Sequence, residues 1–155
     1  AQGAKIIWTI PPSEKYKALG EKALTDGFFG GTTYVESWVG WVGTDAEFII
    51  DLGEEKTVSS IETDFLHQLG AWILLPEKVN YSVSLDNETY THLGSFKFEE
   101  DRDLAVKFKG GKVITDQPVR ARYIKVFIKG IGQCPSWHYG VGHPAWFFID
   151  EVVVL

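Results

Sequence analysis

Short segments in which apolar and polar residues alternate recur along this chain, and turns rich in Gly, Pro and Asp separate them. Alternate residues of an extended segment point to opposite faces, so each segment carries one apolar face and predicts a half-buried strand. The segments are 6–10, 46–52, 59–66, 78–85, 119–129 and 146–155. With so little helical periodicity between them, they restrict the chain to an all-β fold of antiparallel strands.

The alternation also predicts which side chains are buried. The residues expected on the inner faces are Phe48, Ile50, Leu52, Ile61, Thr63, Phe65, Val79, Tyr81, Val83, Leu85, Ile124, Val126 and Ile128. The turn-forming residues 86–88 predict a hairpin after the fourth segment. Only residues 13–25 suggest a helix, and Gly20 interrupts it.

The length of 155 residues suits one domain, because a chain of this size buries roughly two thirds of its unfolded surface. We therefore expect a single antiparallel jelly-roll β-sandwich over residues 1–155, with little helix. The chain begins at Ala1 and contains no Met, so we expect it to be excised from, or processed out of, a larger protein.

The charge excludes some partners. Fifteen Lys and Arg residues against 21 Asp and Glu give a net charge of -6, with no basic cluster, so we expect no nucleic-acid partner and no lipid partner. The single Cys134 excludes an internal disulfide. With His138 and His143 it raises the possibility of zinc, but a structural zinc site needs four protein ligands. We expect these histidines instead to bond to backbone or ligand.

Five of the six Trp residues lie in turn-rich stretches: Trp38, Trp41, Trp72, Trp137 and Trp146. A ring carried on a loop can present a flat apolar face beside polar groups, which suits the recognition of a sugar ring. The alternative is that the rings pack inside the fold. We favour packing for Trp41 and Trp146, and both interpretations stand for Trp72 and Trp137.

Five stretches carry a resemblance to a known family. They are KALTDGFFGG, WVGWVGTDAEFIIDLG, WILLPEKVNYSVSLDNETY, RARYIKVFIKG and CPSWHYGVGHPAWFFIDEVVV, in this order. They resemble successive blocks of the discoidin superfamily, the coagulation factor V/VIII C-type domains, whose bacterial members include the family 32 carbohydrate-binding modules. They are most similar to the C-terminal accessory domain of Bacteroides-type family 20 β-hexosaminidases (chitobiases). The resemblance extends from about Tyr16 to the end of the chain.

The resemblance implies a galactose-binding-like jelly roll with a structural calcium ion between the first loop and the last strand. The matching positions here are Asp26, Thr33 and Glu151. The chemistry supports them, because a carboxylate on an apolar strand needs a partner or a cation, and hard oxygen ligands suit calcium. Alternatively, Glu151 faces solvent and Asp26 only shapes its turn.

The resemblance also implies that sugars bind to loops at one end of the sandwich. The corresponding loops here are 34–45, 67–72 and 133–143. The candidate ligand-binding residues, with Trp137 and His138 first and Trp72 next, are Trp137, His138, Trp72, His67, Gln68, Glu36 and Tyr139. Together they offer aromatic surface, hydrogen-bond donors and acceptors.

We expect no catalytic site in this chain. Glycoside hydrolysis needs two carboxylates across the scissile bond, and the acidic cluster at 99–101 is interpreted as a solvated loop. No nucleophile motif such as GxSxG is present. A hexosaminidase active site would lie in a domain of the parent protein outside this chain.

The first functional hypothesis is an accessory module that binds N-acetylhexosamine- or galactose-containing glycans and keeps a glycoside hydrolase near its substrate. Its partners would be glycans and the catalytic domain of the same polypeptide. The second is an interaction domain that packs on the catalytic domain without binding sugar, marked by an exposed apolar patch. A third, lipid insertion through Trp38, Val39 and Trp41, conflicts with the acidic Glu36 and Asp45 nearby. The resemblance implies a periplasmic, outer-surface or secreted location in a Gram-negative bacterium.

Overall fold

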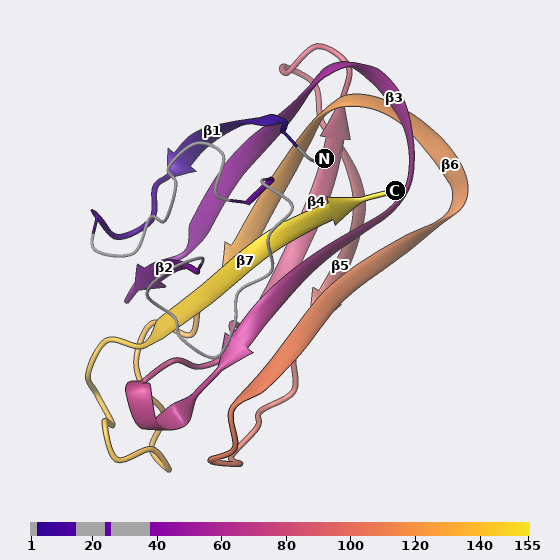
Figure 1. The fold of residues 1–155 in the computed structure, drawn as a ribbon. Helices are drawn as coiled ribbons and strands as arrows, with labels where there is room; N and C mark the ends of the chain where they lie inside the picture. The colour runs from indigo at the N-terminus through magenta and orange to yellow at the C-terminus, as the bar shows by residue number, and fades with distance from the viewer. Residues whose placement is uncertain (1–2, 15–23, 26–37) are drawn as a thin grey trace.

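The computed structural model describes residues 3–14, 24–25 and 38–155, and these form an antiparallel β-sandwich (Figure 1). The elements are β1 (Lys5–Ile10), β2 (Val39–Val42), β3 (Ala46–His67), the 3-10 helix η3 (Leu69–Ala71), β4 (Lys78–Ser84), β5 (Thr91–Lys97), β6 (Lys107–Lys129) and β7 (Trp146–Val154). The expected all-β fold with little helix is confirmed.

Two long strands, β3 and β6, belong to both layers of the sandwich. Residues 47–51 of β3 pair with β1, whereas residues 61–65 pair with β7. β6 follows β3 along almost all of its length, and the two strands arch over together at the upper right of Figure 1. β4 and β5 extend the first layer, and β2 pairs with β7 in the second. The segments expected at 46–52 and 59–66 are therefore one bent strand.

The space between the layers holds the main core, and the alternation predicts its composition well. Every residue expected on an inner face is buried except Leu52, which is partly buried, and Leu85. The prediction for Leu85 is wrong: β4 ends at Ser84, and the Leu85 side chain, in the turn that follows, is 54% exposed.

The hairpin expected after β4 is confirmed, because β5 pairs antiparallel with β4. In its turn, the Asp86 carboxylate accepts hydrogen bonds from the backbone N–H groups of Glu88 and Thr89, both at 2.9 Å. Asn87 adopts a positive φ of 61°, which Asn tolerates better than most residues. The turn is therefore stabilised by Asp and Asn in the way that Asx turns are, and these residue types can be recognised in the sequence.

The tryptophans divide into two groups, and three of the five in turn-rich stretches, Trp38, Trp41 and Trp146, pack against the buried clusters. Trp38 and Trp41 are fully buried, and Trp41 lies in β2 with its Nε1–H donating to the Ile10 carbonyl at 3.0 Å. Trp146 begins β7 and stacks on Phe148. Packing is thus confirmed for Trp41 and Trp146, and burial removes the apolar spikes proposed for lipid insertion.

Some expectations fall on residues that the structure does not describe. The helix suggested for 13–25 lies mostly outside the described ranges, as do Asp26, Thr33 and Glu36. Across 3–14, 24–25 and 38–155, no helix has the length and apolar character needed to span a membrane.

Replacement of Trp41 by Ala should strongly destabilise the fold. The substitution removes a ring stacked on Phe147 and leaves the Ile10 carbonyl without its donor, so we expect the free energy of unfolding to fall by about 3–5 kcal/mol. Urea unfolding monitored by circular dichroism measures this. Ile114→Ala, at a site 70% exposed, is the control, with an expected change of about 0.5 kcal/mol or less. A loss below about 1 kcal/mol for Trp41→Ala would contradict the assignment of this ring to the core.

Candidate functional site

Two segments expected to form a site, residues 67–72 and 133–143, lie side by side at one end of the sandwich. The second of them, a loop between β6 and β7, is closed by backbone hydrogen bonds between Cys134 and His143 (2.8 Å) and between Cys134 and Gly142 (3.2 Å). Trp72 is tied to β7, because its carbonyl accepts the backbone N–H of Trp146 at 3.0 Å. Both loops are therefore anchored on the sheet.

His138 joins the two loops. Its Nε2 lies 2.8 Å from the Leu69 carbonyl, which can only accept, and its Nδ1 accepts the backbone N–H of Gly140 at 2.9 Å. This pair of contacts assigns the neutral tautomer with the proton on Nε2. The expectation that a loop histidine bonds to backbone is confirmed, and both ring nitrogens of His138 are engaged inside the protein. The geometry supports a structural role for this side chain.

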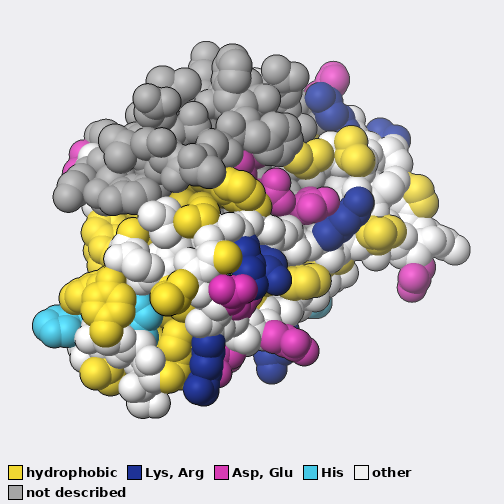
Figure 2. Space-filling model, turned by 60° about the horizontal axis from the view of Figure 1, so that its bottom comes forward, with side chains coloured by type: hydrophobic (Ala, Val, Ile, Leu, Met, Phe, Trp, Pro, Cys, Tyr) yellow, Lys and Arg dark blue, Asp and Glu magenta, His cyan; other side chains and the backbone are white. Residues whose placement is uncertain are grey.

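Aromatic rings lie on the outer side of the contact between His138 and Leu69. The Trp72 ring lies edge-on to Tyr139, with 5.9 Å between ring centroids, and 5.3 Å from the His143 ring. Tyr139 is 66% exposed, although its hydroxyl donates to the Gly70 carbonyl at 2.6 Å. Figure 2 shows hydrophobic side chains and histidines gathered at this end of the molecule, at the lower left. The rings form a convex aromatic tip.

A cleft of about 480 Å³ lies beside the tip, within the usual range of roughly 300–1,000 Å³ for small-molecule sites. Its apolar wall comes from Leu74, Leu75, Pro76, Phe98, Ile131, Cys134, Pro135 and Trp137. Its polar side chains are His67, Glu77, Glu99, Glu100, Asp101 and Gln133. The cleft thus combines an indole with carboxylates, an imidazole and an amide.

Trp137 connects the two sides of the cleft. Its Nε1–H donates to the Glu100 carboxylate, and the Arg102 guanidinium lies over its ring at 5.2 Å from the centroid. Arg102 also pairs with Glu100 at 3.0 Å. The Trp137 hydrogen bond and then Arg102 lower the pKa of Glu100. These contacts hold the loop at 98–106 against the loop at 133–143.

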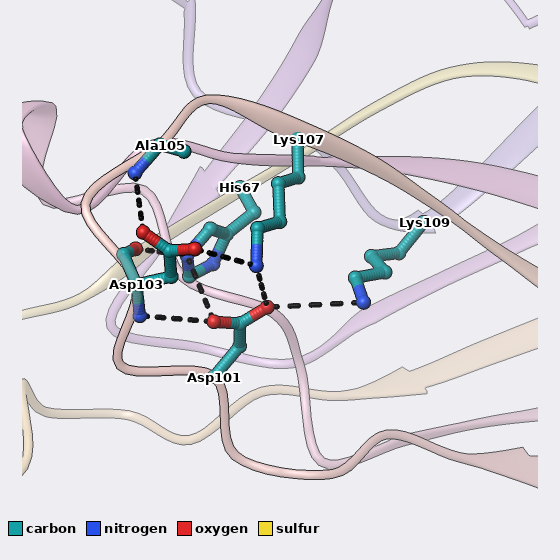
Figure 3. A network of polar contacts seen from close by, with 6 residues as sticks. All are labelled: His67, Asp101, Asp103, Ala105, Lys107 and Lys109. Atoms are coloured by element: carbon teal, nitrogen blue, oxygen red, sulfur yellow. Dashed lines mark hydrogen bonds and ion pairs between the residues drawn. The ribbon is translucent and has the colours of Figure 1, made fainter.

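The acidic segment at 99–101 lines this cleft: Glu99 and Glu100 are exposed, as expected for a solvated loop, whereas Asp101 is only 15% exposed and takes part in a network. Figure 3 shows the reason: the Asp101 carboxylate accepts the backbone N–H of Asp103 at 2.9 Å and the Lys107 ammonium at 3.0 Å. These contacts lower the pKa of Asp101 to about 2. The sequence signal that could have indicated this network is the alternation of Lys107 and Lys109, which places both ammonium groups on one side of the strand, within reach of Asp101.

His67 lies beneath this network and is almost completely buried. Its Nε2–H donates to the Asp103 carbonyl at 2.8 Å and lies 3.8 Å from the Asp101 carboxylate. Its Nδ1 is buried without a hydrogen-bond partner among the described residues, and so is the Oε1 atom of Gln68. The structure therefore brings His67 and Trp137 to one cleft, while Trp72 and Tyr139 form the adjoining tip.

Glu151 is the one predicted calcium ligand among the described residues. It lies in β7 next to Asp150, and both side chains are buried. A buried carboxylate in this position fits a hard cation such as calcium. The parts of the chain that the structure describes contain no group of three or more His, Cys, Asp or Glu arranged to hold a metal ion. With Asp26 and Thr33 outside those parts, the calcium site stays a prediction.

The low pKa of Asp101 predicts a specific acid sensitivity. The folded-state pKa lies below the ordinary value, so ionised Asp101 stabilises the fold fully above about pH 4 and loses this effect as the pH falls towards 2. Asp101→Asn should lower stability at neutral pH, and its deficit relative to the wild type should shrink between about pH 4 and pH 2. Urea midpoints at several pH values measure the difference, with Asp116→Asn, outside the network, as control. A deficit that is constant across this range would contradict the assignment.

Comparison with known proteins supplies the family. The F5/8 type C domain profile matches residues 9–146. No curated protein sequence matches the chain significantly. Among solved structures, the family 32 carbohydrate-binding module of Clostridium perfringens NanJ, in complex with galactose, has a TM-score of 0.60 and 20% identity, covering 97% of this chain and 92% of that module. The CBM32-5 module of GH89 from the same organism, in complex with GalNAc-β-1,3-galactose, has a TM-score of 0.60 and 16% identity, covering 98% and 94%.

A third structure, SpGH29, has a TM-score of 0.60 and 16% identity over 99% of this chain, which spans only 27% of the SpGH29 chain. At these identities the structural likeness shows the fold, a jelly-roll β-sandwich. F5/8 type C domains are non-catalytic modules, in agreement with the expectation that this chain is not an enzyme. Because the profile covers most of the sequence, this chain belongs to the F5/8 type C, or discoidin, domain family.

Proposed function

We propose that this chain is a carbohydrate-binding module whose site is the cleft beside Trp137. One observation carries the proposal: an indole ring and polar side chains from two loops line the same cleft of about 480 Å³. A pyranose ring has an apolar C–H face and a rim of hydroxyl groups, so it needs aromatic surface with donors and acceptors beside it. The cleft provides both.

Individual side chains have distinct roles in this proposal. Trp137 supplies the apolar surface, and its hydrogen bond to Glu100 fixes the orientation of the ring. Glu99 and Gln133 are exposed on the cleft wall, where a carboxylate can accept and an amide can both donate and accept hydrogen bonds from sugar hydroxyls. His138 holds the loop in place, and the aromatic tip of Trp72 and Tyr139 extends the surface beyond the cleft.

The ligands of the structural neighbours support this class of ligand. The NanJ module was solved with galactose, and the GH89 module with a disaccharide of N-acetylgalactosamine and galactose. For this chain we propose N-acetylhexosamine- or galactose-containing glycans. The GH89 module takes its name from a glycoside hydrolase, which supports an accessory role beside a catalytic domain of the same polypeptide, at an extracellular or cell-surface location. A family 20 hexosaminidase parent rests on sequence resemblance alone.

A structural calcium ion near Glu151 is a second part of the proposal. Calcium prefers carboxylate and carbonyl oxygens, and Glu151 offers a carboxylate that is buried in β7. Asp26 and Thr33 complete the proposed ligand set from the sequence. The ion would stabilise the fold, and Glu151 is not among the described residues that line the sugar cleft.

A second candidate function is an interaction domain that packs on a neighbouring domain without binding sugar. The observation in its favour is a group of exposed apolar side chains in and just before β6: Leu104 (74% exposed), Val106 (43%), Phe108 (51%) and Ile114 (70%). Such exposure is typical of contact surfaces. It does not involve the cleft, so substitutions can separate the two functions.

Trp137→Ala should abolish glycan binding with little loss of stability. The ring is partly exposed, packs against the small cluster around Leu69 and Cys134, and otherwise contacts the exposed Glu100 and Arg102, so its removal should weaken binding at least about tenfold. A glycan array followed by calorimetry on the best ligand measures the affinity, and thermal unfolding measures the stability.

Two controls give this experiment its direction. Ile114→Ala removes an exposed apolar side chain far from the cleft and should leave glycan binding unchanged. Tyr139→Ala alters the tip and not the lining of the cleft. If it lowered glycan affinity more than Trp137→Ala does, the binding site would have to be assigned to the tip. A folded sample that binds no glycan on the array would favour the interaction domain instead.

Calcium should raise the melting temperature of the wild-type chain, and a chelator should lower it, because a bound ion stabilises only the folded state. Glu151→Gln should abolish this response while preserving the size of the side chain. Differential scanning fluorimetry with added calcium or EDTA measures both. An unchanged melting temperature of the wild type under the two conditions would contradict the proposed ion.

A further inference from the structure

A second hollow of about 520 Å³ adjoins the cleft. Its lining residues are Gly43, Thr44, Asp45, Glu77, Lys129, Gly130, Ile131 and Gly132. Glu77 and Ile131 line both the cleft and this hollow. The two are therefore consecutive parts of one groove at this end of the sandwich.

The second hollow is built by two turns that are fastened together. The Asp45 carboxylate accepts the backbone N–H of Gly130 at 3.0 Å, and its other oxygen lies 3.5 Å from the Lys129 ammonium. The backbone N–H of Glu77 donates to the Lys129 carbonyl at 2.8 Å, which fixes the shared wall. A Cβ atom at Gly130 would lie 2.5 Å from the Thr44 carbonyl oxygen. The close approach of the turns therefore depends on glycine.

The chemistry of this hollow complements that of the cleft. None of its described lining residues is aromatic, but they present an exposed ammonium on Lys129 and carboxylates on Asp45 and Glu77. Neighbouring hydroxyl groups of a sugar can pair with a donor and an acceptor held this close together. The Glu77 carboxylate forms no hydrogen bond or ion pair with the described residues. Glu77 lines both hollows, so this carboxylate lies where they meet.

We propose that the groove binds two consecutive sugar residues of a glycan, one in the cleft beside Trp137 and the next in the hollow beside Lys129. This inference rests on the proposed function and adds a second subsite to it. The ligand is then at least a disaccharide, and the Glu77 carboxylate accepts hydrogen bonds near the linkage between the two residues. Lys129 is a specificity-determining residue for the length of the bound glycan.

Titration calorimetry with four neutral probes tests the proposal. They form two pairs, each a monosaccharide and a disaccharide that contains it. The first pair is N-acetylgalactosamine and GalNAc-β-1,3-galactose, and the second is N-acetylglucosamine and its β-1,4-linked disaccharide. One or two added hydrogen bonds should make the disaccharide of the recognised pair bind roughly threefold to tenfold more tightly than its monosaccharide. Equal affinity for monosaccharide and disaccharide in both pairs would overturn the second subsite and leave the proposed function intact.

Lys129→Met should remove this disaccharide advantage and leave monosaccharide affinity unchanged. The substitution keeps the length of the side chain, and the exposed pair with Asp45 contributes little to stability. Lys125→Met is the matched control, since it lies in the same strand but lines neither hollow. If Lys129→Met weakened the binding of monosaccharide and disaccharide alike, or left the binding of both unchanged, the assignment would be contradicted. If none of the four probes binds to the wild type, the proposed function fails for these glycans, and the second subsite fails with it.

Discussion

The candidate site depends on the hydrogen bonds that the buried His138 ring makes to the Leu69 carbonyl and the Gly140 amide. The first contact connects the loop before β7 to the turn after β3, far away in the sequence, and the second holds the ring within its own loop. A buried polar ring is favourable only when its nitrogens are satisfied, so the joint has one geometry and one tautomer. That geometry fixes the backbone on either side of His138, where Trp137 and Tyr139 lie. The positions of the Trp137 and Tyr139 rings therefore depend on the buried hydrogen bonds of His138.

Electrostatics fix the opposite side of the cleft. The loop between β5 and β6 has little apolar burial of its own, and the network of His67, Asp101 and the lysines of β6 holds it in place. Several charges that share partners can contribute where isolated surface pairs contribute little. Trp137 then links this charged loop to the loop that His138 anchors. The cleft is held from both sides by contacts between residues far apart in the sequence.

The sequence predicted the sandwich and most of its buried faces, because strand alternation is a local property. It could not predict that residues 46–67 form one bent strand, since the bend follows from pairing with β6. It correctly favoured packing for Trp41, but it gave Trp38 only as a ring in a turn-rich stretch, because local composition does not show that β2 pairs with β7. The loops at 67–72 and 133–143 were correctly grouped, but only through family resemblance. The role of Asp101 was missed, because a run of acidic residues looks solvated until the lysines on the paired strand are placed beside it.

Family membership and cleft geometry lead to the same account: a rigid sandwich that holds one partly exposed indole beside polar side chains. The most direct measurement is a two-dimensional NMR titration that follows the indole N–H resonances of the Trp residues while a bound glycan is added. The account predicts that the Trp137 resonance shifts strongly, because its Nε1–H lies at the wall of the cleft, while those of the buried Trp38 and Trp41 stay in place. A glycan that binds without moving the Trp137 resonance would contradict it.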